Sequence, residues 1–196
     1  MPYHSKQLSI TPFRLGIFDD EVLLISISKI THKQYNKIFN DIGSCTKAFM
    51  SEIISFESKL LLSQMQGYLA ISEKSPWHLN NWLIKRCLPD ELSTWLFSKA
   101  KEDNFLSEER YLEMYTSAAK SKGSKPRWRI RRELIEKGIP RQLLEDFELD
   151  DVVSLGIIFK NDRRFKNQPR EQIIKRLQSK GFKYIDIVSV LAKNIQ

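Results

Sequence analysis

Apolar residues recur at helical spacing over most of the chain, from about residue 58 onward. Stretches of roughly 10 to 15 residues carry apolar side chains three or four positions apart, and short polar, Gly- or Pro-containing connections separate them. Ser75 followed by Pro76 is typical of a helix N-terminus, and Gly138 and Gly181 stand where left-handed residues end helices. The pattern predicts many short helices joined by tight turns.

The beginning of the chain follows a different pattern. Residues 13–28, FRLGIFDDEVLLISIS, contain two apolar runs around a polar pair, which predicts a β-hairpin with residues 22–27 as its clearer strand. Three consecutive acidic residues, Asp19, Asp20 and Glu21, could form a carboxylate cluster for acid or metal chemistry. A polar turn between the two strands explains them more simply.

Two helices are expected after the hairpin. We expect Thr31 to cap a short helix that runs through Phe39 and ends near Gly43. A second helical region carries the apolar residues Phe49, Ile53, Ile54, Phe56 and Leu60.

One unit then recurs three times, and we call its pattern the repeat frame. Two apolar residues stand four positions apart on one helix face, a basic and a small residue end the helix, and apolar residues follow the turn. The copies are Leu79, Leu83, Arg86-Cys87-Leu88 and Leu96; Ile130, Leu134, Lys137-Gly138-Ile139 and Phe147; and Ile173, Leu177, Lys180-Gly181-Phe182 and Val190. Each helix pair needs a third helix to close its core, which segments 59–72, 107–120 and 150–160 provide.

The predicted fold class is therefore mostly α. Tandem three-helix repeats form an elongated helical array, preceded by a small N-terminal β-hairpin and helix segment. The expected domains are the N-terminal segment 1–57, a first repeat 58–104, a second, basic repeat 105–147 and a third repeat 148–196.

The net charge of +8 is concentrated in one part of the chain. Residues 120–183 hold 18 basic and 9 acidic residues, a net of +9, while the remainder holds 14 basic and 15 acidic, a net of −1. This asymmetry favours contact with a polyanion or an acidic protein surface, although a solvated basic surface remains the plain alternative.

The positive charge forms two groups. The first precedes and fills the helix at 126–137, and the second lies in and after the polar loop 161–168. The acidic stretch between them, residues 145–151, is explained by capping of the following helix. The candidate residues for binding a protein partner or DNA are Lys120, Lys122, Lys125, Arg127, Trp128, Arg129, Arg131, Arg132, Arg163, Arg164, Lys166, Arg170, Lys175 and Arg176.

Trp128 has two interpretations. At 100° per residue it projects roughly 160° away from Ile130, so both cannot enter the same core. It either packs against a neighbouring repeat or anchors a partner, since Trp and Arg dominate interface energies. For Trp77, Trp82 and Trp95, packing in or between units is the simpler interpretation.

The sequence offers no pattern for catalysis or metal binding. Cys45 and Cys87 form no C-x-x-C pair, and His4, His32 and His78 lie far apart. No nucleophile motif or phosphate-binding glycine loop is present. We therefore expect no enzyme activity and no cofactor, and, with no apolar segment of membrane-spanning length, a cytoplasmic protein with free thiols.

The ordered repeats resemble the RecX family of recombination regulators. LSEERYLEMYTSAAKSKGSKPRWRIRRELIEKGIPRQLLEDF, residues 106–147, is similar to the family's central segment, and the last repeat, 173–191, resembles its closing helix pair. This sequence departs from the family at three places: Cys87 stands where the family has Gly, His78 where it has Glu, and Ser107-Glu108-Glu109 where it has an Asp pair.

The resemblance implies a monomeric, non-enzymatic partner of the RecA recombinase filament. Members of the family bind that filament on DNA and restrain its ATPase, recombinase and coprotease activities, in DNA repair, homologous recombination and the SOS response. Basic faces would allow direct contact with single- or double-stranded DNA. The alternative is a sequence-specific, helix-turn-helix-like transcriptional regulator with residues 126–137 as its recognition helix.

Overall fold

The chain divides into two compact units, residues 1–107 and 108–196, each described by itself. The computed structural model describes residues 4–7, 14–19, 22–35, 47–123, 125–162, 165 and 168–194. The division after Ser107 lies close to the boundary expected between the first and second repeats. The boundary expected after residue 57 falls inside a continuous helix.

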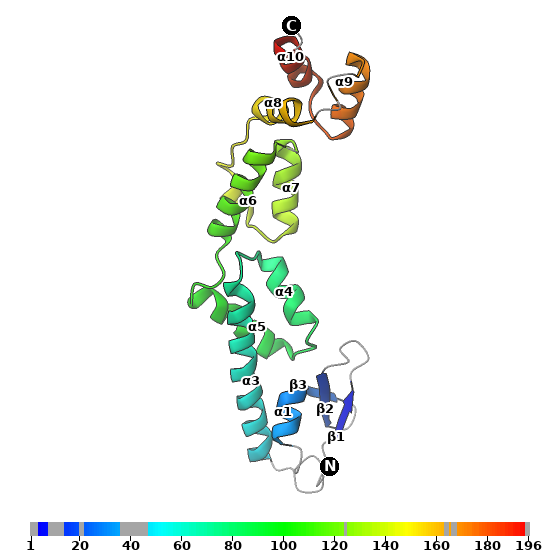
Figure 1. Cartoon of the computed structure of the whole chain (residues 1–196). Coiled ribbons are helices and arrows are strands. Elements are labelled where there is room, and N and C mark those ends of the chain that lie inside the picture. Colours follow the sequence, from blue (N-terminus) through cyan, green and yellow to red (C-terminus); the bar gives the residue numbers. More distant parts are fainter. Residues whose placement is uncertain are drawn as a thin grey trace. The chain divides into compact units, whose positions relative to one another are not determined.

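The first unit contains a small sheet and helices (Figure 1). Its described elements are β1 (His4–Gln7), β2 (Arg14–Asp19), β3 (Val22–Ser28), α1 (Lys29–Gln34), α3 (Lys47–Ala70), α4 (Pro76–Ile84) and α5 (Asp90–Glu102).

The strands form an antiparallel sheet in the order β1-β2-β3 within the described residues. The predicted hairpin is confirmed as β2 and β3, with Arg14 opposite Ser28 and Asp19 opposite Val22. The strand β1 was not predicted from the sequence. Asp20 and Glu21 lie outside the described residues, so the turn interpretation stays a prediction for them.

The first helix begins earlier than predicted, because Ser28 and not Thr31 is its N-cap. The Ser28 side chain accepts a hydrogen bond from the backbone N–H of Thr31, while Thr31 is fully buried inside the helix. The described helix ends at Gln34, and the expected continuation to Phe39 lies outside the described residues.

The 24-residue helix α3 joins the sheet to the first repeat. Near its start, Met50 and Ile53 pack with the sheet residues Ile17, Ile25 and Ile27. Farther along, its apolar face enters the core of the first repeat. One helix serves two cores, and for this reason the N-terminal segment and the first repeat form one compact unit.

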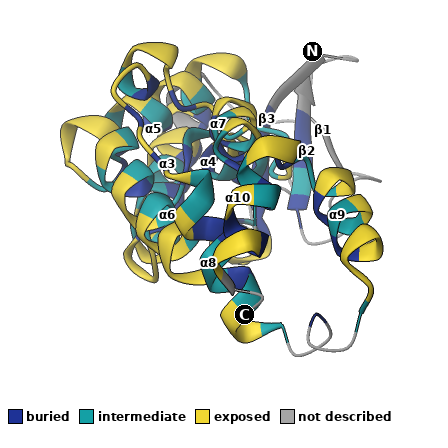
Figure 2. Cartoon of the chain, turned by 90° about the horizontal axis from the view of Figure 1, so that it is seen from above, coloured by how far each residue is buried: buried dark blue, intermediate teal, exposed yellow. Residues whose placement is uncertain are grey.

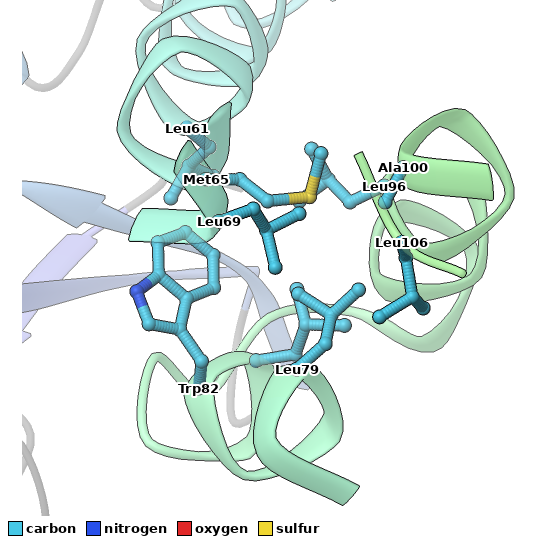
Figure 3. Close-up of a cluster of buried hydrophobic side chains, with 9 residues drawn as sticks. Leu61, Met65, Leu69, Leu79, Trp82, Leu96, Ala100 and Leu106 are labelled. Atoms are coloured by element: carbon cyan, nitrogen blue, oxygen red, sulfur yellow. The ribbon is translucent and has the colours of Figure 1, made fainter. Parts of the chain in front are cut away.

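The core of the first repeat joins three helices (Figure 3). Leu61, Met65 and Leu69 of α3 meet Leu79, Trp82 and Leu83 of α4 and Leu96 and Ala100 of α5, together with Leu106. Trp82 is buried, as the packing interpretation predicted, whereas Trp77 and Trp95 are 47% and 43% exposed.

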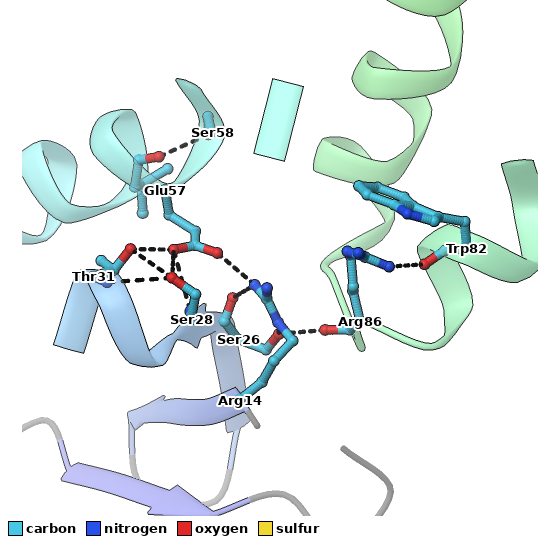
Figure 4. Close-up of polar contacts among 9 residues, drawn as sticks. Arg14, Ser26, Ser28, Thr31, Glu57, Ser58, Trp82 and Arg86 are labelled. Carbon is cyan, nitrogen blue, oxygen red and sulfur yellow. Dashed lines mark hydrogen bonds and ion pairs between the residues drawn. The ribbon is translucent and has the colours of Figure 1, made fainter. Parts of the chain in front are cut away.

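A buried polar cluster also ties the sheet to the helices (Figure 4). Arg14 of β2 forms an ion pair of 2.6 Å with Glu57 of α3, and both side chains are almost fully buried. Glu57 also accepts hydrogen bonds from Ser28 and Thr31, which satisfies its second oxygen. Its charge is thus fully compensated, as burial requires.

The cluster reaches the turn after α4. Ser26 accepts from the Arg14 guanidinium at 2.7 Å and donates its hydroxyl to the backbone carbonyl of Arg86. The Arg86 guanidinium lies 3.3 Å from the ring centroid of Trp82. Burial, followed by the positive charge of Arg14, lowers the pKa of Arg86 to about 10.

The second unit contains the two remaining repeats. Its described elements are α6 (Glu108–Lys122), α7 (Arg127–Glu136), the 3-10 helix η2 (Arg141–Leu144), α8 (Asp151–Asn161), α9 (Arg170–Ser179) and α10 (Tyr184–Asn194). Each helix carries exposed and buried residues along its length (Figure 2), as amphipathic helices do. The second repeat ends with the 3-10 helix η2, whereas the third repeat ends with the full helix α10.

The described residues confirm the repeat frame. Every apolar frame residue lies in the core of its own repeat, with Leu88 only partly buried. At the turn after each first frame helix, Cys87, Gly138 and Gly181 have φ angles of +48°, +83° and +98°. Cys87 thus adopts the left-handed conformation that glycine provides without a steric cost in the other two copies.

Candidate partner-binding surface

The surface is built on α7, whose orientation the repeat frame fixes. Pro126 stands directly before the helix, and Ile130 and Leu134 are 1% and 0% exposed in the core of the second repeat. Because these residues define the inward face, positions about 160° away must lie outside. Trp128 and Arg132 lie at this angle from Ile130, and Arg129 lies about 100° from it; all three are exposed.

Trp128 packs against the third repeat. Its indole Nε1 donates a hydrogen bond of 2.8 Å to the backbone carbonyl of Gly181, in the turn between α9 and α10. A Cβ at position 181 would lie 2.6 Å from Cζ2 of the Trp128 ring. Of the two interpretations of Trp128, packing between repeats is the one found, although 51% of the residue stays exposed.

The start of α7 is bound to the start of α8. Asp150 caps α8 by accepting from the backbone N–H groups of Val152 and Val153, as expected for this acidic stretch. Asp151 instead accepts from the backbone N–H of Arg127 at 2.7 Å. Burial raises the pKa of Asp151, although this hydrogen bond opposes the change.

Two arginines of α7, Arg129 and Arg132, form ion pairs along the helix. Arg129 Nε lies 3.6 Å from Glu133, and Arg132 Nε lies 2.9 Å from Glu136. Pairs of this spacing stabilise a helix by only about 0.3–0.5 kcal/mol. Both guanidinium groups can therefore exchange their present partner for a carboxylate or phosphate of another molecule.

The remaining arginines of α7 lie on one flank of the helix. At 100° per residue, Arg127 and Arg131 fall on the opposite side of the core face from Glu133. Both are half-buried. The four arginines therefore do not form one continuous patch, because the helix distributes them over two flanks and the outer face.

Glu133 organises the other flank, together with residues of α6 and the loop before α7. The Tyr115 hydroxyl donates to its Oε2 at 2.6 Å, and Lys125 Nζ lies 2.7 and 2.6 Å from its two oxygens. Burial opposes ionisation of Glu133, but the bonds from Lys125 and Tyr115 outweigh it and lower its pKa. Burial and the bond to Glu133 raise the pKa of Tyr115.

Sequence reasoning did not identify Glu133 and Tyr115 as part of this site. The two residues lie 18 positions apart on different helices, and neither belongs to the repeat frame. The available signal was that Glu133 is the first acidic residue after the basic segment 120–132.

The basic residues of the third repeat are less completely described. Arg163, Arg164 and Lys166 lie outside the described residues, and Arg170 and Lys175 are exposed on α9. Arg176 lies 4.0 Å from Asp162, and its guanidinium is 5.4 Å from the Phe165 ring centroid.

The last turn of α6 carries Lys120 and Lys122, both exposed. Of the predicted site residues, the fold brings Lys122 and Lys125 to one hollow between α6 and α7, with Arg129 bound to the same carboxylate as Lys125.

In the described part of the chain, no group of three or more His, Cys, Asp and Glu side chains could hold a metal ion. None of the described helices combines the length and apolar character needed to cross a membrane.

Comparisons with known proteins connect the second repeat to one family. Residues 107–146 match the family model described as "RecX, second three-helix domain". The "Regulatory protein RecX" of Streptococcus mutans serotype c is 23% identical over 126 residues, which cover 60% of this chain and 48% of that protein. The match thus spans about half the length of this curated relative.

Two solved structures share the fold. The "Crystal structure of regulatory protein RecX" has a TM-score of 0.59 at 17% identity, covering 96% of both chains. The "Crystal structure of RecX from Lactobacillus salivarius" has a TM-score of 0.57 at 18% identity, covering 69% of this chain and 95% of that one. The mostly α architecture of three-helix repeats is confirmed by this likeness.

Proposed function

We propose that this chain, for which the comparisons support the RecX family, is a regulator of the RecA recombinase that binds RecA filaments on DNA. Binding lowers the ATPase, recombinase and coprotease activities of the filament. The protein acts in the cytoplasm as a monomer and performs no chemistry of its own.

The observation that carries this proposal is the outer face of α7. It lies within the segment that matches the family's second three-helix domain, and Arg129 and Arg132 are held on a packed scaffold in weak pairs along the helix. A rigid helix presents these side chains at low entropic cost, which favours binding to an acidic protein surface or to phosphates.

The contacts of α7 favour a filament regulator over a sequence-specific transcriptional regulator. A recognition helix contacts base edges in the major groove with its N-terminal residues. At this end of α7, the Arg127 N–H is bonded to Asp151 and the Trp128 indole to Gly181. The third repeat therefore covers part of the surface that would have to enter the groove.

The proposal is tested by the rate of ATP hydrolysis of purified RecA on single-stranded DNA, with increasing amounts of this protein. We expect the rate to fall as the protein is added. An unchanged rate, up to equimolar protein and RecA, would contradict the proposal.

A second measurement addresses direct DNA contact. We expect the protein alone to bind DNA weakly and without sequence preference, with an affinity that falls steeply with salt because phosphate contacts carry it. Tight, sequence-selective duplex binding would support the transcriptional regulator instead.

A further inference from the structure

A small hollow lies between α6 and the start of α7 in the second unit. Ala118, Ala119 and Ile130 line its apolar part, and Tyr115, Lys122 and Lys125 complete it. Its volume is about 240 Å³. This volume is below the roughly 300–1,000 Å³ typical of small-molecule sites. The size fits one side chain of a partner.

The charges around the hollow are unequal. Lys125 and Arg129 share the single carboxylate of Glu133, and Lys122 is exposed at the end of α6. Three positive groups and one negative group give a local net charge of +2. A partner segment with carboxylates beside an apolar side chain is complementary to this arrangement.

We propose that this hollow receives an apolar side chain from an acidic segment of a protein partner. The apolar side chain covers Ala118, Ala119 and Ile130, and the neighbouring carboxylates pair with Lys122 and Lys125. This inference rests on the proposed function in taking the recombinase filament as the source of the segment, and it names the chemistry by which the filament is recognised.

The lining favours a protein segment over a nucleic acid. Proteins that bind single strands stack bases on exposed aromatic rings. Here the apolar lining is aliphatic, and the single aromatic ring, Tyr115, is half-buried with its hydroxyl bound to Glu133.

The site is tested directly by NMR of the full chain with labelled Ala and Ile methyl groups. The probe is the peptide acetyl-Asp-Leu-Asp amide, and its uncharged counterpart acetyl-Asn-Leu-Asn amide is the control. We expect the acidic peptide to shift the methyl signals of Ala118, Ala119 and Ile130 in a saturable way, at lower concentration than the uncharged one. No shift of these methyl groups would overturn the inference, as would shifts caused by a short oligothymidylate but not by the peptide.

Two variants test the hollow in filament binding. Ala118→Phe fills the space without changing the charge, and Lys122→Glu reverses an exposed charge without filling it. We expect each to weaken binding to RecA filaments by about tenfold, the size of effect that a central interface residue has. The matched controls are Ala192→Phe on α10 and Lys160→Glu on α8, which alter exposed residues away from the hollow and should leave the affinity unchanged.

The outcomes separate the two proposals. If the unaltered protein does not bind filaments but the acidic peptide shifts the methyl signals, the hollow is supported and the proposed function is contradicted. If the protein binds filaments and both hollow variants bind as the controls do, the inference is overturned and the proposed function stands. Helicity and melting temperature of Ala118→Phe are measured first, and Lys122→Glu decides if that variant does not fold.

Discussion

Trp128 donates its indole N–H to the backbone carbonyl of Gly181 at 2.8 Å, across 53 residues of the chain. This contact joins the first frame helix of the second repeat to the turn of the third repeat. The contact gives Trp128 a structural role. Two features require glycine at position 181: the φ angle of Gly181 is +98°, and the Trp128 ring occupies the space that a Cβ would take.

Gly181→Ala should therefore destabilise the second unit. The left-handed conformation alone costs a residue with a Cβ about 1–2 kcal/mol, and displacement of the Trp128 ring adds to this. In a Trp128→Ala background the steric part should disappear. Chemical denaturation of the two single variants and the double variant measures this coupling.

Gly156→Ala is the matched control for Gly181→Ala. Gly156 lies inside α8, and nothing lies within 4 Å of a Cβ built there. Alanine should stabilise this helix by about 0.8–1 kcal/mol. Equal effects of alanine at positions 156 and 181 would contradict the described packing.

Cys87→Gly should stabilise the first unit by about 0.5–1 kcal/mol. Cys87 has a φ of +48°, and relief of left-handed strain exceeds the added flexibility of glycine in the unfolded chain. Cys87→Ala keeps the Cβ and should bring no gain. Thermal or urea unfolding compares the two, and a Cys87→Gly variant no more stable than Cys87→Ala would refute the strain at this turn.

Glu57→Ala should cost about 3–5 kcal/mol of stability, because it leaves the Arg14 charge buried without its partner. Glu57 is 0% exposed and Arg14 is 7% exposed. Ser55→Ala, at an exposed position of the same helix, should change stability by no more than about 0.5 kcal/mol. If Glu57→Ala and Ser55→Ala unfolded at similar denaturant concentrations, the buried ion pair would not contribute to stability as described.

The Glu133 cluster should make the second unit sensitive to acid. The folded-state pKa of Glu133 lies below its ordinary value of 4.5, so its contribution is fully present above that value. The contribution is lost as the pH falls through the lower folded-state pKa, where protonation weakens the pairing with Lys125. Stability measured from about pH 7 to pH 3 should fall more steeply for the unaltered protein than for Glu133→Gln. If stability depended on pH equally in the two proteins, the Glu133 cluster would not be the source of the acid sensitivity.

The repeat frame was predictable because it depends on local rules. Apolar residues four apart, a small residue at the helix end and an apolar residue after the turn leave a signal in any copy, as at Leu134, Gly138 and Ile139. The segments that close each core were predicted for the same reason. The 3-10 turn at 141–144 was not, since its apolar pattern resembles that of a short α-helix.

Long-range polar contacts were not predictable in the same way. Glu57 lies four residues after Ile53 and four before Leu61, on the buried face of α3, so its burial left a signal in the sequence. Its partner Arg14 left none, because 43 residues separate the two. The contact of Trp128 with Gly181 left no signal either, because 53 residues separate the two. The sequence placed Trp128 outside its own core but did not show whether another repeat or a partner covers it.

The central claim, that α7 acts on the recombinase filament through its arginines, is tested most directly by one comparison. ATP hydrolysis by RecA on single-stranded DNA is followed with the unaltered protein and with a variant carrying Arg129→Ala, Arg131→Ala and Arg132→Ala. A control variant carries Arg141→Ala, Lys160→Ala and Lys193→Ala, which removes three exposed positive charges of the same unit. We predict that the α7 variant loses the inhibition while it stays folded and that the control retains it. Equal inhibition by all three proteins would contradict the claim.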